Sequence, residues 1–140
     1  MAQKLTATLT LSSTAGSTGA SNNMDIDLSV SDELTIVAPL QGLSTVIATA
    51  TGGNTIIKPA GTVIAYLYIK HTGTTDGATA TTKQVDVEFT TGEAIARLSA
   101  DEFLFTPVHH AEENVGVQLH VQHSDPSDVA QMEYAWFTKG

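Results

Sequence analysis

Apolar and polar residues alternate along much of the chain. In KLTATLTL, residues 4–11, leucine or alanine occupies every second position and threonine lies between them. NMDIDLSV, residues 23–30, repeats the pattern with aspartate and serine at the polar positions. A period of two places alternate side chains on opposite faces of a strand, so both segments are predicted to be half-buried β-strands. SSTAGSTGASNN, residues 12–23, joins them and is predicted to be a flexible connector.

The remaining strands predicted by this pattern are short and follow one another closely. TGGN, KPAG, TTGE and HSDPSD supply the turn signals between several of them. Many short strands without helical periodicity predict an all-β fold, an antiparallel β-sandwich or jelly roll. With no internal repeat, one domain is expected over residues 1–140, with a Thr/Gly-rich loop at about 72–82. The further predicted strands span residues 34–38, 44–51, 62–71, 83–90, 94–98, 102–108, 115–123 and 130–138.

The predicted strand at residues 62–71 is apolar on both faces. A sandwich strand needs only one buried face, so the second requires a cover. One hypothesis is that the Thr/Gly-rich loop folds back over it. The other is that a neighbouring subunit covers it, since tyrosines are common in interface cores. One face carries Val63, Ala65, Leu67 and Ile69, and the second carries the interface candidates Ile64, Tyr66 and Tyr68.

Aromatic residues gather in the second half of the chain. DEFLFTPV places Phe103 and Phe105 on one side of a strand and Leu104 on the other. MEYAWFTKG places Trp136 opposite Phe137 at the C-terminus. Most of these rings are expected to pack in the core. The last strand, which carries the only tryptophan, is expected to be central to the fold.

Composition narrows the possible partners. The 140 residues include 41% hydrophobic residues, but no apolar run reaches the roughly 20 residues of a membrane-spanning helix. The start of the chain has no apolar secretory signal, which predicts synthesis in a cytoplasm. Fifteen acidic residues against six basic ones give a charge of −9, so neither direct nucleic-acid binding nor membrane binding is expected. Without cysteine, stability must come from packing or assembly.

Five histidines raise the question of a metal site. His120 and His123 are three residues apart on a predicted strand, so their side chains should point to opposite faces. His109 and His110 diverge in the same way, and VHHAEENVG is interpreted as a solvated loop, with no metal and no cofactor expected. In a symmetric oligomer, copies of His109 or His110 could meet at an axis, so both are interface candidates.

Acidic pairs give little support for catalysis. Asp25 and Asp27 share one strand face, as do Asp86 and Glu88, but alternation places all four on polar faces. They are interpreted as solvated or as part of a contact with a basic partner. The chain has no nucleophile elbow, phosphate loop or dinucleotide fingerprint. DPSD, residues 125–128, is interpreted as a turn, so no enzymatic activity is predicted.

Two segments carry a family resemblance. YLYIKHTGTTDG (66–77) and RLSADEFLFTPV (97–108), with VDVEFTTGEAIARL (85–98) between them, resemble the small all-β virion proteins of tailed bacteriophages. The match covers about a third of the chain, near residues 62–108. The chain departs from the pattern with His71 at the usual Asn position and SADEF in place of a Pro-Gly turn.

This resemblance implies a structural protein without catalytic residues. The leading expectation is a capsid decoration (cement) protein that stabilises the shell, with a tail, neck or fibre component as the alternative. Its expected location is the virion, assembled in the host cytoplasm. Its expected partners are the major capsid protein or other virion proteins and further copies of itself, for example in a trimer.

Two other classes remain open. A carbohydrate-binding or receptor-binding β-sandwich module would use Tyr66, Tyr68 or Trp136 as stacking platforms. A small cupin-like metalloenzyme would bind a metal through His109, His110, His120 or His123 together with Glu113.

Overall fold

The computed structural model describes residues 2–13, 26–50, 55–58, 64, 66–90, 93–108, 116–122, 125 and 127–140. Within these ranges the chain is all-β, and no helix is long and apolar enough to cross a membrane. The strands are β1 (Gln3–Ser12), β2 (Asp27–Thr49), β3 (Thr55–Lys58), β4 (Tyr66–His71), β5 (Val85–Thr90), β6 (Glu93–Leu98), β7 (Phe103–Pro107), β8 (Val117–Val121) and β9 (Val129–Lys139).

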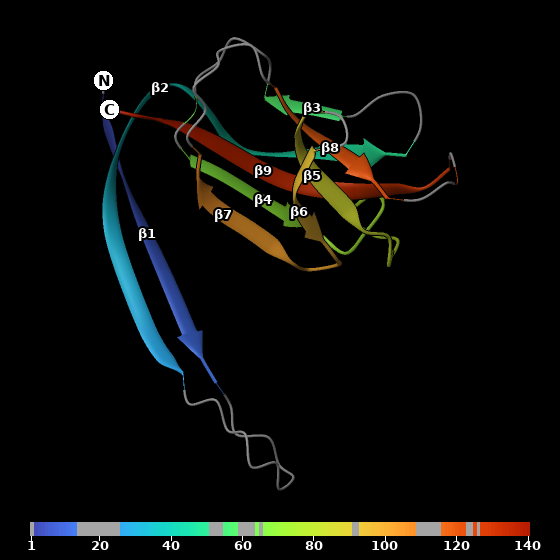
Figure 1. Ribbon diagram of the computed structural model, residues 1–140, viewed down its shortest axis with the longest axis horizontal. Coiled ribbons are helices and arrows are strands. Elements are labelled where there is room, and N and C mark those ends of the chain that lie inside the picture. Colours follow the sequence, from blue (N-terminus) through green and yellow to red (C-terminus); the bar gives the residue numbers. More distant parts are fainter. Residues whose placement is uncertain are drawn as a thin grey trace, which may run out of the picture.

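The strands form two antiparallel sheets that pack against each other (Figure 1). One sheet has the order β1-β2-β9-β4-β7 and the other β3-β8-β5-β6. β2 pairs with β9, β3 with β8, β4 with β7 and β5 with β6. This nesting of pairs is the topology of a jelly roll, with β1 added at one edge. The predicted fold class is therefore confirmed.

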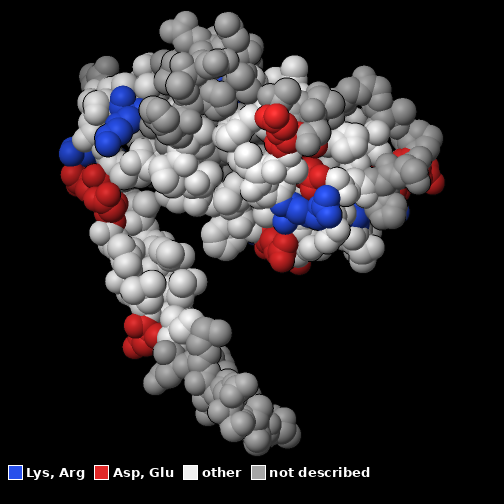
Figure 2. Space-filling view, in the orientation of Figure 1, with Lys and Arg blue, Asp and Glu red and all other residues white. Residues whose placement is uncertain are grey.

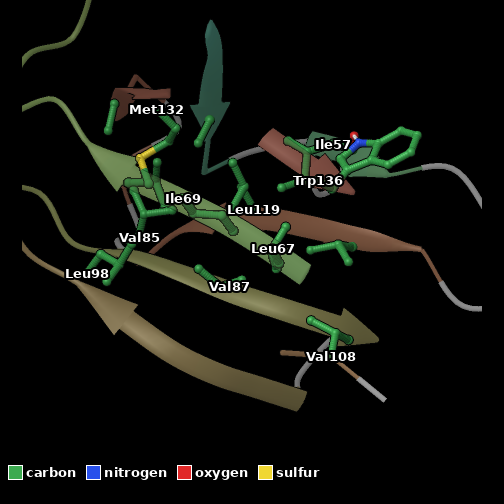
Figure 3. Packing of buried hydrophobic residues seen from close by; sticks show 14 of the residues in the cluster. Ile57, Leu67, Ile69, Val85, Val87, Leu98, Val108, Leu119, Met132 and Trp136 are labelled. Atoms are coloured by element: carbon green, nitrogen blue, oxygen red, sulfur yellow. Dashed lines mark hydrogen bonds between the residues drawn. The ribbon is translucent and has the colours of Figure 1, made fainter. Parts of the chain in front are cut away.

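The core lies between the two sheets. Figure 3 shows apolar side chains from both layers pointing toward one another, among them Leu67 on β4, Val87 on β5 and Leu119 on β8. These three residues are fully buried. β9 is the central strand of the five-stranded sheet, and its Met132 is also fully buried. The prediction that the C-terminal strand is central is confirmed.

The structure joins three predicted strands into one. β2 covers 23 residues and joins residues of three segments that were predicted as separate strands at 23–30, 34–38 and 44–51. Its pairing with β9 shifts register between Val37 and Leu40 and between Gln41 and Ser44. These irregularities accommodate Pro39, which has no N–H to donate, and Gly42. Proline and glycine, which often end strands, therefore lie at bulges inside this long strand.

β3, residues Thr55–Lys58, was not predicted. Its first three residues lie between the turn signals TGGN and KPAG, and Lys58 belongs to the second of them. Four residues are too few to display an alternating pattern. It becomes a strand because β8 pairs with it, with Thr55 opposite Leu119 and Ile56 opposite Gln118.

Ser12 and Ser13 belong to a hairpin, not to the connector predicted to begin at residue 12. Ser12 pairs with Asp27, and the Ser13 amide donates to the Ile26 carbonyl over 2.8 Å. The Ile26 amide donates in turn to Ser13 Oγ over 2.9 Å. The rest of the predicted connector, residues 14–23, lies outside the described residues.

Candidate docking groove

β1 and the first half of β2, residues 3–12 and 27–36, form a two-stranded arm that extends away from the two-sheet body (Figure 1). Its register places Leu9 opposite Val30 and Leu11 opposite Leu28, so one face of the arm is apolar apart from Asp32, which lies opposite Ala7. These four side chains expose between 43% and 52% of their surface. Leu5 and Leu34 continue the same face toward the body.

The opposite face of the arm is polar, and its side chains bond to each other. Thr8 Oγ1 and Ser31 Oγ lie 3.1 Å apart across the two strands. Lys4 Nζ lies 2.8 Å from Glu33 Oε1 and donates to Thr35 Oγ1 over 3.2 Å. Solvent exposure suits this polar face. The apolar face is also exposed, because no described part of the chain fully covers its side chains. The sequence pattern alone predicted these two faces.

The outer face of the five-stranded sheet is also apolar. Tyr68 lies between Ala135 on β9 and Phe105 on β7, while Tyr66 pairs with Phe137. The rings of Tyr66 and Phe105 stack with centroids 6.0 Å apart and planes at 7°. Phe103, farther along β7, exposes 61% of its surface. These aromatic residues form a wall that faces away from the core.

A groove of about 790 Å³ lies between the arm and this aromatic wall, and β1 borders it with residues of both its faces. Figure 2 shows the hollow between the arm and the body. Among the described residues that line it, Asp32 is the only charged one, although the whole chain carries −9. The lining residues are Leu5, Thr6, Ala7, Thr8, Leu9, Thr10, Val30, Asp32, Leu43, Tyr68, Phe103, Phe105, Ala135 and Phe137.

The Tyr68 hydroxyl is a polar group of the aromatic wall that is held by a hydrogen bond. Its hydroxyl donates to Glu133 Oε1 over 2.9 Å. Burial, the hydrogen bond and the negative charge of Glu133 all disfavour ionisation and raise the pKa of Tyr68 to about 12. The phenol is therefore neutral at physiological pH and offers the wall a fixed, uncharged polar group.

The interface candidates from the sequence are placed differently from one another. Tyr66 and Tyr68 lie half-buried on the aromatic wall, as predicted, while their role in an interface stays a prediction. Ile64 was expected on the same face, and this placement is wrong because Ile64 is 3% exposed and belongs to the core. β4 begins only at Tyr66, so the alternation does not extend to Ile64. His109 and His110 lie outside the described residues.

Trp136 is not available as a stacking platform. Its ring is 8% exposed and packs in the core near Ile57 (Figure 3). The indole Nε1 donates to the Ile57 carbonyl over 3.1 Å, which ties the two sheets together. Trp136 faces inward because it shares its side of β9 with Met132, whereas Phe137 points to the aromatic wall.

His71 has a structural role at the end of β4. It is fully buried, and its Nδ1 accepts a hydrogen bond of 2.9 Å from the Gly73 amide. The other ring nitrogen, Nε2, therefore carries the proton and donates to the Lys83 carbonyl over 2.9 Å. Within the described ranges, no group of three or more His, Asp or Glu residues could hold a metal ion. His123 lies outside those ranges.

The prediction that Asp86 and Glu88 are solvated is wrong. They are 2% and 5% exposed on β5. Arg97 meets the Asp86 carboxylate in a bidentate contact, with Nε at 2.8 Å from Oδ1 and Nη2 at 3.2 Å from Oδ2. Gln122 also donates to Asp86. Because this carboxylate is occupied by its own neighbours, we assign it a structural role.

The Thr/Gly-rich loop does not cover the aromatic wall, although one of the two hypotheses expected it to. The Thr72 amide and hydroxyl donate to the Gln131 carbonyl over 3.1 and 2.9 Å, which fixes the loop beside β9. At its tip, Asp76 Oδ1 accepts from the amides of Ala78 and Thr79 over 2.9 and 2.7 Å. These bonds lower the pKa of Asp76. The loop is thus a compact, internally bonded turn.

Sequence reasoning missed the groove as a whole. It identified the apolar positions on β1, β2, β4 and β7 separately, but alternation does not reveal which strands share a layer. The exposed Leu43 in the second bulge of β2 was also missed, although it is 66% exposed at the groove. Its position next to Gly42, between the strands predicted at residues 34–38 and 44–51, was the only available signal.

Comparison with known proteins adds no family to this description. No protein-family model matches the chain, and neither a curated protein nor a solved structure does.

Proposed function

We propose that this chain is a non-enzymatic structural protein of a bacteriophage virion, in the first place a capsid decoration protein. The observation that carries the proposal is the apolar surface formed by the arm and the aromatic wall. Soluble monomers seldom expose contiguous apolar patches beyond a few hundred Å², and larger patches mark interaction sites. A protein that works by burial against neighbouring subunits requires such a surface.

The shape of the chain supports the same role. An arm of ten paired residues per strand extends about 30 Å at 3.3 Å per residue. This length is enough to reach across a boundary between neighbouring shell subunits. The major capsid protein or another virion protein is the partner implied, together with further copies of this chain. Jelly rolls occur in viral capsid domains and in lectins, so the fold is compatible with the role without identifying it.

In this proposal the protein strengthens the particle by adding buried contacts between shell subunits. The apolar residues of the arm would leave water when the arm meets its neighbour, at about 25 cal/mol for each Å² of apolar surface removed from water. A tail, neck or fibre component would use the same surface at another place in the virion.

The test compares virions with and without this protein. Particles that lack it should release DNA at a lower temperature and at weaker osmotic stress, and adding the purified protein back should restore the difference. A matched add-back uses Leu9→Asp on the apolar face of the arm and Ser29→Asp on its polar face, outside the groove lining. Only Ser29→Asp should restore stability. Equal stability of particles with and without the protein would contradict the decoration role.

The exposed aromatic wall favours a second function, a carbohydrate-binding or receptor-binding module. Phe103 and Phe105 expose 61% and 39% of their surfaces, and aromatic rings of this kind can stack against sugars. Retention on a host polysaccharide that Phe103→Ala abolishes and Ile56→Ala preserves would support this function. Ile56 is a suitable control because it is 63% exposed and lies on the other sheet.

A further inference from the structure

We infer that the groove is an interface with a second copy of this chain, in which two hook-shaped protomers face each other with their concave sides. Each arm then closes the hollow of its partner. The inference deepens the proposed function, because it names the surface through which the decoration protein forms an oligomer. First, the arm and the aromatic wall, which no described part of the chain covers, belong to one chain and border one hollow. Two copies related by a twofold axis through that hollow cover the arm and the wall of both chains at once.

The amount of exposed apolar surface is the second argument. Eight large apolar residues of β1, β2 and β7 expose 39% to 66% of their surface. With about 150 Å² for each side chain, they present on the order of 600 Å². A standard interface buries about 800 Å² per partner, including its polar rim. The eight residues are Leu9, Leu11, Leu28, Val30, Leu40, Leu43, Phe103 and Phe105.

Charge supplies the third argument. Two copies that each carry −9 repel one another unless they meet at a surface with few charges. The described groove lining has a single charged residue, Asp32, and interface cores are depleted in charge. The ion pair between Lys4 and Glu33 lies on the polar face of the arm, away from the hollow. This distribution allows like-charged copies to approach.

The arm itself supplies the fourth argument. A two-stranded ribbon is marginally stable in water unless its apolar face packs on another layer. β1 is also an edge strand, and its ten residues contain one charged side chain, Lys4, and no proline. Edge strands that stay unpaired usually carry more charged residues or a proline, which prevent pairing with another chain. A second copy provides the missing layer for the apolar face. We favour a twofold pair over the trimer because the arm and the wall of one chain face the same hollow.

The test is sedimentation of the full chain over a dilution series. The wild type should reach twice the mass of one chain at high concentration and dissociate on dilution. Leu9→Asp and Phe103→Asp should raise the dissociation constant of the dimer at least tenfold. The matched controls Ser29→Asp, on the polar face of the arm and outside the groove lining, and Ile56→Asp, on the other sheet, should change it less than twofold.

Amide hydrogen exchange provides a measurement that needs no substitution. Amides of residues 3–12 and 27–36 should exchange more slowly at a concentration where the dimer forms than at one where it dissociates, while the amides of β5 and β8 should not change. A wild type that stays monomeric, or an oligomer that Leu9→Asp and Phe103→Asp leave intact, would overturn the inference. A mass above two chains would overturn the twofold arrangement. These outcomes are independent of the comparison of particles with and without the protein, which tests the decoration role.

Discussion

At the scale of single residues, the two faces of β4 show how neighbours in sequence take opposite roles. Leu67 is fully buried between the sheets, while Tyr68 lies on the aromatic wall and donates to Glu133. The phenol has an environment that disfavours its charged form, and the pKa of Tyr68 rises from 10.0 to about 12. The same contacts that shape the wall therefore link stability to pH.

The first prediction concerns this linkage. Because the folded chain binds the phenolic proton more tightly than the unfolded chain, the contribution of Tyr68 to stability is complete below pH 10.0 and is lost as the pH rises toward about 12. Tyr68→Phe removes the ionisable group. The difference in free energy of unfolding between wild type and Tyr68→Phe should therefore shift against the wild type above pH 10.0.

Denaturant unfolding at a series of alkaline pH values measures that difference. Glu133→Gln is the matched variant, because it keeps an acceptor for the Tyr68 hydroxyl but removes the negative charge. It should reduce the effect without abolishing it. Parallel stability curves for wild type and Tyr68→Phe across this range would contradict the prediction.

At the scale of elements, β9 organises the sheet on which the groove depends. It pairs with β2 along one edge and with β4 along the other. Its inner face carries Met132 and Trp136 into the core, and its outer face carries Phe137 to the wall. An element that serves both surfaces cannot be removed without separating the arm from the body.

The second prediction follows from the position of β9. A chain that ends at Ala130 should lose its cooperative thermal transition, because β2 and β4 would no longer share a partner strand. Met132→Ala, a milder change at a fully buried position, should lower the free energy of unfolding by about 2–5 kcal/mol. Lys139→Ala, at the exposed end of the same strand, should change it by less than about 0.5 kcal/mol.

Calorimetry of the truncated chain and denaturant unfolding of the two substituted chains test these expectations. A cooperative melt of the chain that ends at Ala130 would show that the remaining strands form a stable sandwich on their own. In that case, β9 would be dispensable for the core.

At the scale of the whole molecule, an acidic chain presents a nearly uncharged hollow. The charge of −9 opposes association of identical copies, while burial of the arm and the wall favours it. Salt changes the balance because it shortens the range of electrostatic repulsion, from about 10 Å at 0.1 M to about 3 Å at 1 M.

The third prediction is therefore that added sodium chloride strengthens the proposed dimer. The dissociation constant from sedimentation should fall as salt rises, and Ser29→Asp, which adds one negative charge per copy outside the groove, should respond more steeply than the wild type. A dissociation constant that rises with salt would mean that ion pairs, and not apolar burial, hold the two copies together.

The sequence by itself determined the strand character of the chain and the two faces of most strands. Alternation correctly placed Leu9 and Leu11 on one face of β1 and Phe103 and Phe105 on one face of β7, because side-chain direction in a strand depends only on position. It also identified the excess of apolar residues around Tyr66 and Tyr68. Element boundaries near Pro39, Gly42 and Ile64 were less accessible, since bulges and strand ends depend on the partner strand.

Only the tertiary structure decided which apolar faces meet. Trp136 and Phe137 are adjacent and both aromatic, yet one fills the core and the other lines the groove. Asp86 and Glu88 follow a polar pattern but are buried, and Asp86 is held by Arg97 and Gln122. These outcomes depend on layer order, which arises from long-range strand pairing and is invisible to a local pattern. The same pairing brings the arm and the wall to one hollow, because β1 pairs with β2 and β2 pairs with β9 of the body.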